Sequence, residues 1–331
     1  MIKDEILTSD KNDRYSLFPI KHNDIWEMYK KHKNTFWTVE EIDMSIDKKE
    51  WHTLSSAEQF FIENILAFFA QSDTIVLDNL ITNFCQEVTI PEARFFYSFQ
   101  AMIENIHSEA YSLMIDTFID NSERKNELFN AMEKVPCVQK KANWAIKWIH
   151  ENEQKKSPVA LRLLAFGIVE GLFFSGSFCA IFWLKEKGKL VNSLGKSNEW
   201  ISRDESLHTD FAILLYTKYV ENKIDENVVH DIMREAVQIE EEFICSSISV
   251  NMIGMNINLM KQYIHYVADR LLVQFGYSKL YYKENPFPFM QKISLHGKTN
   301  FFEQRSSEYN LVNMGSSNKD LFALDLENSI F

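Results

Sequence analysis

The chain has 331 residues and a formal net charge of −12, with 35 Lys and Arg against 47 Asp and Glu. Hydrophobic residues make up 46% of it and include 26 Phe, enough for a deep core, while 9 Gly and 6 Pro are few for this length and favour long helices. The acidic balance, with no run of Lys and Arg, excludes a basic nucleic-acid-binding surface.

Residues 1–50 are expected to form an irregular N-terminal arm, in which Asn34–Asp43 is the most structured part. Residues 51–300 are expected to form one helical domain. Its predicted elements are helices at about 53–85, 91–120, a short pair split by Pro136, 158–184, 198–220, 226–252 and 255–275, with a loop over 188–196. From about residue 300 the chain is polar and rich in turn residues. Residues 301–331 are therefore predicted to be a flexible tail that docks on a partner, with a frayed terminus as the alternative.

The segment Leu163–Leu184 is apolar and long enough to cross a membrane. It carries one charge, Glu170, which would be costly near the centre of a bilayer without a partner. A helix at the centre of a large bundle is also apolar on all sides. Since no second span accompanies it, we expect a buried helix and no membrane association.

The cysteines and the N-terminus indicate the compartment. The four Cys residues are far apart, without a C-x-x-C pattern, and Met1–Arg14 is polar and mixed in charge, unlike a signal peptide. Reduced thiols in the cytoplasm are therefore expected.

The pattern Glu-x-x-His occurs twice, at 104–107 and at 205–208. Residues three apart share one face of a helix, so each pair can direct a carboxylate and an imidazole to one point. Two such helices, plus one carboxylate from each of two others, form the dimetal ligand set of ferritin-like bundles. Asp73 and Glu170 are available as the two further carboxylates. The chain is therefore predicted to be an all-α, ferritin-like helical bundle with a central four-helix dimetal site.

The ligand types narrow the chemistry. Carboxylates suit iron or manganese, and a set with only two His leaves coordination positions open for dioxygen or water. Zinc hydrolases usually use a richer His set. Iron, manganese and a mixed pair all fit these ligands.

Tyr111 lies four residues after His107, on the same helical face and near the predicted metals. An oxidised metal pair can remove one electron and one proton from a phenol, and the resulting radical survives only in a dry pocket. Phe174 and Phe178 follow Glu170 at helical spacing, and Ile201 precedes the second motif by one turn. These three side chains can form such a pocket, although an inward Tyr among aromatic residues is also typical of an ordinary core.

Asp204 directly precedes the second motif and points away from the metals. A carboxylate in such a position commonly accepts the outer N–H of a ligating imidazole, here that of His107. An exposed Asp without this role is the alternative.

These residues belong to longer segments that resemble a known family. The segments are Phe36–Asp43, Ala70–Asp73, Glu92–Tyr97, Glu104–Tyr111, Val169–Phe178 and Ile201–His208. Together they make the chain similar, over nearly its whole length, to the small, radical-generating subunit of class I ribonucleotide reductase in its eukaryotic-type form.

The resemblance assigns roles to individual residues. It implies metal ligands Asp73, Glu104 and His107 at one ion, and Glu170, Glu205 and His208 at the other. It implies a stable radical on Tyr111 in a pocket of Phe174, Phe178 and Ile201. It also implies a radical-transfer relay through His107, Asp204, Trp37 and Tyr309, with Arg203 supporting the link between Asp204 and Trp37.

The resemblance also implies an activity. A diiron centre would use dioxygen to form the tyrosyl radical, which passes to the large subunit for reduction of ribonucleoside diphosphates to deoxyribonucleotides, as DNA replication requires. The chain would be a homodimer and would bind the large subunit through its tail. The ending Leu324–Phe331 departs from the usual short acidic ending, which leaves the docking register open. The alternatives are another ferritin-like oxidase, such as a desaturase or a ligand-binding oxidase, and a non-catalytic metal store or scaffold.

Overall fold

The computed structural model describes residues 5–12, 14, 16–131, 136–149, 158–247 and 255–290. The chain divides into two units, Met1–Pro286 and Phe287–Phe331. The described residues form helices and no strand, which confirms the all-α prediction. Tyr309 and the predicted tail 301–331 lie outside the described residues.

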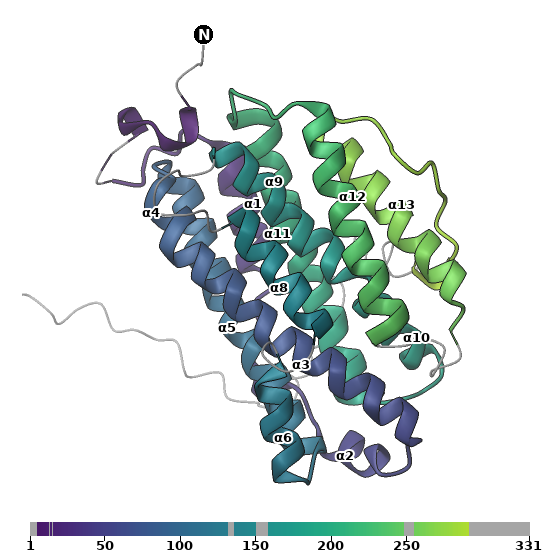
Figure 1. Ribbon diagram of the computed structural model, residues 1–331. Coiled ribbons are helices and arrows are strands. Elements are labelled where there is room, and N and C mark those ends of the chain that lie inside the picture. The colour runs from purple at the N-terminus through teal and green to yellow at the C-terminus, as the bar shows by residue number, and fades with distance from the viewer. Residues whose placement is uncertain are drawn as a thin grey trace, which may run out of the picture. The chain divides into compact units, whose positions relative to one another are not determined.

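The first unit is a bundle of long helices (Figure 1). Its α-helices are α1 Asn23–Lys33, α2 Ser45–Trp51, α3 Ser56–Asn79, α4 Cys85–Glu87, α5 Pro91–Phe118, α6 Ser122–Phe129, α8 Pro136–Ile149, α9 Val159–Ile168, α10 Ser175–Glu186, α11 Lys196–Tyr219, α12 Glu226–Glu242 and α13 Ile257–Phe275. Four π-helical segments continue or precede them: η4 Leu80–Phe84, η5 Val169–Phe173, η6 Val191–Gly195 and η7 Phe243–Ser247. Helix α3 packs along α5, and α9 packs along α11.

Local sequence signals determine where helices α3 and α5 begin. The Ser55 side chain accepts a hydrogen bond from the backbone N–H of Glu58, and the Glu58 carboxylate accepts one from the Ser55 N–H at 2.9 Å, which begins α3. Pro91 occupies the first turn of α5, where its missing N–H removes no helical hydrogen bond.

The N-terminal arm is more ordered than expected. Helix α1 covers 11 residues and buries Ile25 and His32 against the bundle, whereas Asn34–Asp43 contains only the 3-10 turn Val39–Glu41. The helix is short and mostly polar, so its apolar periodicity is weak in the sequence.

The predicted loop at 188–196 also differs, since most of it is the π-helical segment η6. Leu190 turns the chain in a left-handed conformation at φ 47°. The buried Asp47 carboxylate then accepts hydrogen bonds from the backbone N–H and hydroxyl of Ser193, both at 2.6 Å. This ordering comes from a residue about 145 positions away, which local sequence signals cannot reveal.

The apolar segment Val159–Glu186 is a core element. Among the described residues, two helical stretches are long and apolar enough to cross a membrane, Ser56–Glu87 and this one, so the expectation that no second such stretch exists was wrong. Of the most apolar window of Val159–Glu186, 94% is buried within the fold. Neighbouring helices thus take the place that lipid would occupy, as expected for a bundle core.

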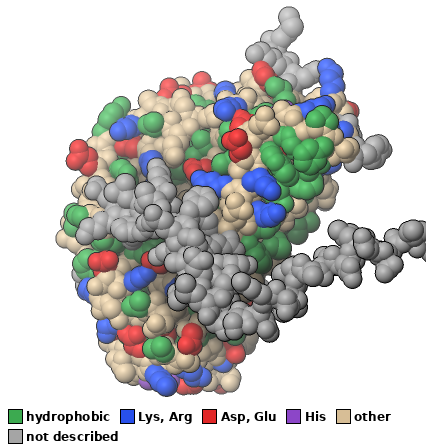
Figure 2. Space-filling model, turned by 180° about the vertical axis from the view of Figure 1, so that it is seen from behind, with side chains coloured by type: hydrophobic (Ala, Val, Ile, Leu, Met, Phe, Trp, Pro, Cys, Tyr) green, Lys and Arg blue, Asp and Glu red, His purple; other side chains and the backbone are tan. Residues whose placement is uncertain are grey.

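Charged side chains of both signs are scattered over the face drawn in Figure 2, where Lys and Arg lie among Asp, Glu and hydrophobic side chains.

A buried ion pair supports the segment that carries Glu170. The ammonium of Lys141, on α8, lies 2.5 Å from the Glu240 carboxylate on α12 and donates a hydrogen bond of 2.7 Å to the carbonyl of Phe173, the last residue of η5. It also faces the rings of Phe68 and Phe243, at 4.0 and 3.6 Å from their centroids. The pair therefore joins two outer helices to the π-helical turn.

We expect Lys141→Met to lower the free energy of unfolding by about 3–5 kcal/mol, because it leaves the buried Glu240 carboxylate unpaired. The double variant Lys141→Met/Glu240→Leu should recover most of that loss, since two apolar side chains replace both charges. Urea denaturation of the four proteins in this cycle measures the effect. Lys147→Met, which breaks a half-exposed pair with Glu235, is the control and should change the free energy by less than about 1 kcal/mol.

The same pair gives the fold a pH dependence. Burial raises the pKa of Glu240 from its ordinary value of 4.5 to about 7 and lowers that of Lys141 from 10.5 to about 8. The folded protein therefore binds more protons than the unfolded chain between pH 4.5 and 7, so the stability contributed by Glu240 is lost as the pH rises through 7. The contribution of Lys141 is lost as the pH falls from 10.5 through 8. A double variant with an unchanged pH profile would contradict this account.

Candidate metal centre

Four neighbouring segments converge on one buried cluster of carboxylates and imidazoles. Helix α3 contributes one member, α5 two, η5 one and α11 two: Asp73, Glu104, His107, Glu170, Glu205 and His208. Their potential ligand atoms fall into two overlapping groups, within each of which the atoms lie within 4.8 Å of one another, and each group can hold a metal ion. The sequence-predicted ligands thus come together at one place.

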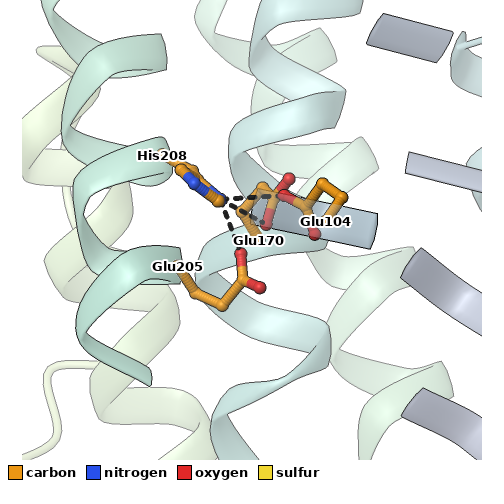
Figure 3. A group of neighbouring side chains, drawn as sticks. All are labelled: Glu104, Glu170, Glu205 and His208. Carbon is orange, nitrogen blue, oxygen red and sulfur yellow. Dashed lines mark hydrogen bonds and ion pairs between the residues drawn. The ribbon is translucent and has the colours of Figure 1, made fainter. Parts of the chain in front are cut away.

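Two carboxylates, those of Glu104 and Glu205, each approach both imidazoles of the cluster, and Glu104 belongs to both groups. The two oxygens of Glu104 lie 3.3 Å from Nδ1 of His107 and 3.0 Å from Nδ1 of His208. The two oxygens of Glu205 lie 3.0 and 2.9 Å from the same two nitrogens. Figure 3 shows the His208 ring facing Glu104, Glu205 and Glu170, whose nearest oxygen is 3.8 Å away. Glu104 and Glu205 therefore each lie between the two imidazoles, an arrangement that the sequence does not specify.

The cluster carries buried polar atoms and negative charge without enough protein partners. Asp73 and Glu170 lie among other carboxylates, and burial together with Glu104 and Glu205 raises their pKa values well above the ordinary range. The buried atoms that make no hydrogen bond include Asp73 Oδ2, both Glu104 oxygens, Glu170 Oε2 and His107 Nδ1. Cations bound in the cluster would both pair these buried polar atoms and offset the negative charge of the carboxylates. The donor set therefore fits a pair of Fe or Mn ions.

The π-helical segment η5 carries Glu170 into the cluster of carboxylates and imidazoles. In a π-helical turn each residue advances by a smaller angle than in an α-helix, so one side chain is displaced from the α-helical register. Gln100 of α5 donates a hydrogen bond of 3.4 Å to the carboxylate of Glu170. The Glu170 side chain is thereby held from the α5 side of the site.

Asp204 backs the imidazole of His107. Its Oδ2 lies 3.4 Å from Nε2 of His107 and accepts a hydrogen bond of 2.8 Å from the indole N–H of Trp37. Arg203 donates to its other oxygen, and the same guanidinium binds the carbonyl of Thr35 at 2.8 Å. Burial by itself would raise the pKa of Asp204, but Arg203 and His107 hold it well below the ordinary value. The carboxylate is thus ionised and connects Trp37 to the metal cluster.

Tyr111 lies in a closed aromatic pocket beside the cluster. Its ring stacks on Phe69 at a centroid distance of 4.6 Å, and Phe69 in turn contacts Phe174 and Phe178 at 5.7 and 5.2 Å. The Tyr111 hydroxyl is buried and makes no hydrogen bond. Burial, followed by the charge of Asp73, raises its pKa well above 10. Ile201, the remaining predicted pocket residue, is buried on α11.

Sequence reasoning missed several residues at the site, among them Gln100, which contacts Glu170, and also Phe69 and His32. Phe69, which stacks on Tyr111, lies four residues before Asp73, so helical spacing could have placed it near the site. His32 lies in the unexpected helix α1, and its Nε2 is 3.2 Å from Nε2 of His208. Burial, and then the proximity of His208, lowers the pKa of His32 well below its ordinary value.

Known proteins place this geometry in a family. The family model described as ribonucleotide reductase, small chain matches residues 14–286. The chain belongs to this family. It is 52% identical to the ribonucleoside-diphosphate reductase small chain of Trypanosoma brucei brucei over 98% of its own length and 95% of that protein. It is 51% identical to human ribonucleoside-diphosphate reductase subunit M2, covering 98% of its own length and 83% of the human subunit.

A solved structure agrees with this placement. The Rnr4 homodimer of Saccharomyces cerevisiae, a ribonucleotide reductase protein, superposes with a TM-score of 0.79 and 37% sequence identity, over 92% of this chain and 93% of that one. The ferritin-like fold and the family prediction are thereby confirmed. Family membership sets aside the desaturase, ligand-binding oxidase and metal-storage alternatives.

Proposed function

We propose that this chain, a ribonucleotide reductase small chain and so an oxidoreductase component, forms a stable radical on Tyr111 and passes its oxidising equivalent to a large subunit. There it would reduce ribonucleoside diphosphates to deoxyribonucleotides. The observation that carries the proposal is the Tyr111 hydroxyl, which is buried and makes no hydrogen bond in an aromatic pocket beside the carboxylate and imidazole cluster.

The cluster would hold two metal ions, which we propose to be iron, with manganese or a mixed pair accepted by the same ligands. Asp73, Glu104 and His107 would hold one ion, and Glu170, Glu205 and His208 the other, with Glu104 also within reach of the second group. When bound, the metal pair supplies dioxygen activation and hence the one-electron oxidant. In return, the ligand carboxylates offset the positive charge of the ions.

The pocket of Tyr111 favours a long-lived radical. On oxidation the phenol gives up one electron and its hydroxyl proton, and the O–H bond breaks. Tyr111 stacks on Phe69, which in turn contacts Phe174 and Phe178, so these aromatic rings would keep water and reductants away from the resulting phenoxyl oxygen. The unpartnered hydroxyl also means that the neutral radical sacrifices no hydrogen bond.

The exit route would run through Trp37. Its indole N–H and the outer nitrogen of His107 meet at one oxygen of Asp204, and the Trp37 and His107 rings stack at a centroid distance of 6.0 Å. Arg203 would fix Asp204 for this contact. Tyr309, the proposed next member, belongs to the tail that we propose docks on the large subunit.

We further propose that the chain acts as a homodimer in the cytoplasm. The superposing Rnr4 structure is a homodimer. All four cysteines are free, as a reducing compartment requires.

The function is tested with the full chain supplied with Fe(II) and oxygen. We expect a tyrosyl signal in the electron paramagnetic resonance spectrum, and reduction of a ribonucleoside diphosphate once the large subunit is added. A variant lacking the last ten residues should keep the metal and the signal but lose the reductase activity. The matched comparison is the full chain at equal radical content.

Two results would refute the proposal in part or in whole. A fully metal-loaded chain that supports no nucleotide reduction with the large subunit would refute the function. Full activity of the truncated chain would refute docking through the tail while leaving the metal and radical assignments intact.

A further inference from the structure

The two imidazoles of the cluster have different outer partners. His107 turns its Nε2 to the ionised carboxylate of Asp204 at 3.4 Å. His208 turns its Nε2 to a second imidazole, the Nε2 of His32, at 3.2 Å. The outer nitrogen of His107 thus faces a negatively charged carboxylate, whereas the outer nitrogen of His208 faces another imidazole.

Geometry assigns the donor and acceptor in the contact between the two imidazoles. Nδ1 of His208 faces the oxygens of Glu205 and Glu104 at 2.9 and 3.0 Å, so this is the nitrogen whose lone pair is available to a metal. In the metal-binding tautomer the ring proton then resides on Nε2. The His208 N–H therefore donates and the Nε2 lone pair of His32 accepts.

The surroundings of His32 suit an uncharged acceptor. The residue is 0% exposed at the end of α1, and its ring contacts the rings of Phe96 and Phe99 at 5.0 and 4.8 Å. Its Nδ1 is also buried and makes no hydrogen bond. An apolar side chain in this place would avoid the unpaired Nδ1 but would leave the Nε2–H of His208 without its partner. The contact with His208 is therefore the one polar interaction by which the described structure accounts for an imidazole here.

We propose that His32 is a positioning residue that fixes the tautomer and ring orientation of His208 for metal binding without adding charge. The inference rests on the proposed metal site. Asp204 makes the imidazole of His107 more basic, whereas His32 gives His208 only orientation. The two metal positions are consequently unequal, and their stepwise affinities are set by different residues.

The test uses metal binding to the full-length apo protein. Mn(II) is titrated in, and the electron paramagnetic resonance signal of free Mn(II) gives the two stepwise dissociation constants. His32→Leu, which has similar bulk and no acceptor, should weaken one step by about 10–100-fold. His32→Gln, whose amide oxygen can accept the same N–H, should restore that step to within about threefold of wild type. Asp204→Asn is the matched variant for the other imidazole and should weaken the other step.

Two results would overturn the proposed role of His32. Wild-type affinities in His32→Leu would overturn the proposal, and so would equal weakening in the Leu and Gln variants, because the effect would then come from packing. If His32→Leu does not fold, His32→Ala replaces it as the variant without an acceptor. Thermal unfolding of the apo proteins should not distinguish the acceptor-free variant from Gln. A wild-type protein that binds no Mn(II) would instead overturn the proposed metal site, and this inference with it.

Discussion

Tyr111→Phe is expected to abolish the tyrosyl radical signal while the protein still binds two metal ions. The substitution removes only the hydroxyl, which makes no hydrogen bond, and leaves a ring that can stack on Phe69 as before. The fold and the carboxylate cluster should therefore persist, and reductase activity should fall to the background of the metal-free protein. Electron paramagnetic resonance after addition of Fe(II) and oxygen, together with metal analysis, measures both parts.

A second buried tyrosine provides the control. Tyr97 lies on the same helix α5, is 1% exposed like Tyr111, stacks on Phe84 at 5.2 Å and also has a hydroxyl without a hydrogen bond. Among the described residues its ring contacts Phe84, Phe96 and Phe211, none of which is a member of the cluster. Tyr97→Phe should keep the full radical signal. A radical of wild-type intensity and line shape in Tyr111→Phe would show that another residue carries it.

The sequence predicts the metal cluster well because the information is local. Two Glu-x-x-His patterns lie in segments whose own composition predicts helix, and the spacing of three residues directs each pair to one point. Asp204 and Tyr111 follow from the same spacing, as neighbours of these pairs along α11 and α5. The structure brings all of them together.

Other features of the site depend on distant residues and could not be predicted. His32 reaches His208 from a short polar helix whose position is fixed only by packing. The approach of Glu104 to His208 and of Glu205 to His107 depends on the distance between α5 and α11, which the order of residues does not encode. The π-helical turn at Glu170 likewise depends on Lys141, whose ammonium caps the Phe173 carbonyl from another helix.

Trp37→Phe is expected to stop turnover with the large subunit, because Trp37 contacts Asp204. Trp37 is 3% exposed, and its indole N–H donates to the oxygen of Asp204 that also faces His107. Trp37→Phe keeps an aromatic ring but removes both this hydrogen bond and a side chain that is easily oxidised. Metal content and the radical on Tyr111 should remain, because neither requires the indole.

Turnover with the large subunit should fall in Trp37→Phe to the background measured without the large subunit, because the route from His107 through Asp204 then loses its next member. Trp51→Phe is the matched control, because Trp51 is 4% exposed and stacks on Phe118 at 5.4 Å without contacting the cluster. It should retain turnover. Activity and radical content are measured on the same samples, so that a loss of transfer is separated from a loss of radical. Normal turnover in Trp37→Phe would show that Trp37 is not part of the transfer route. If the radical were lost together with turnover, Trp37 would instead stabilise the site and not serve transfer.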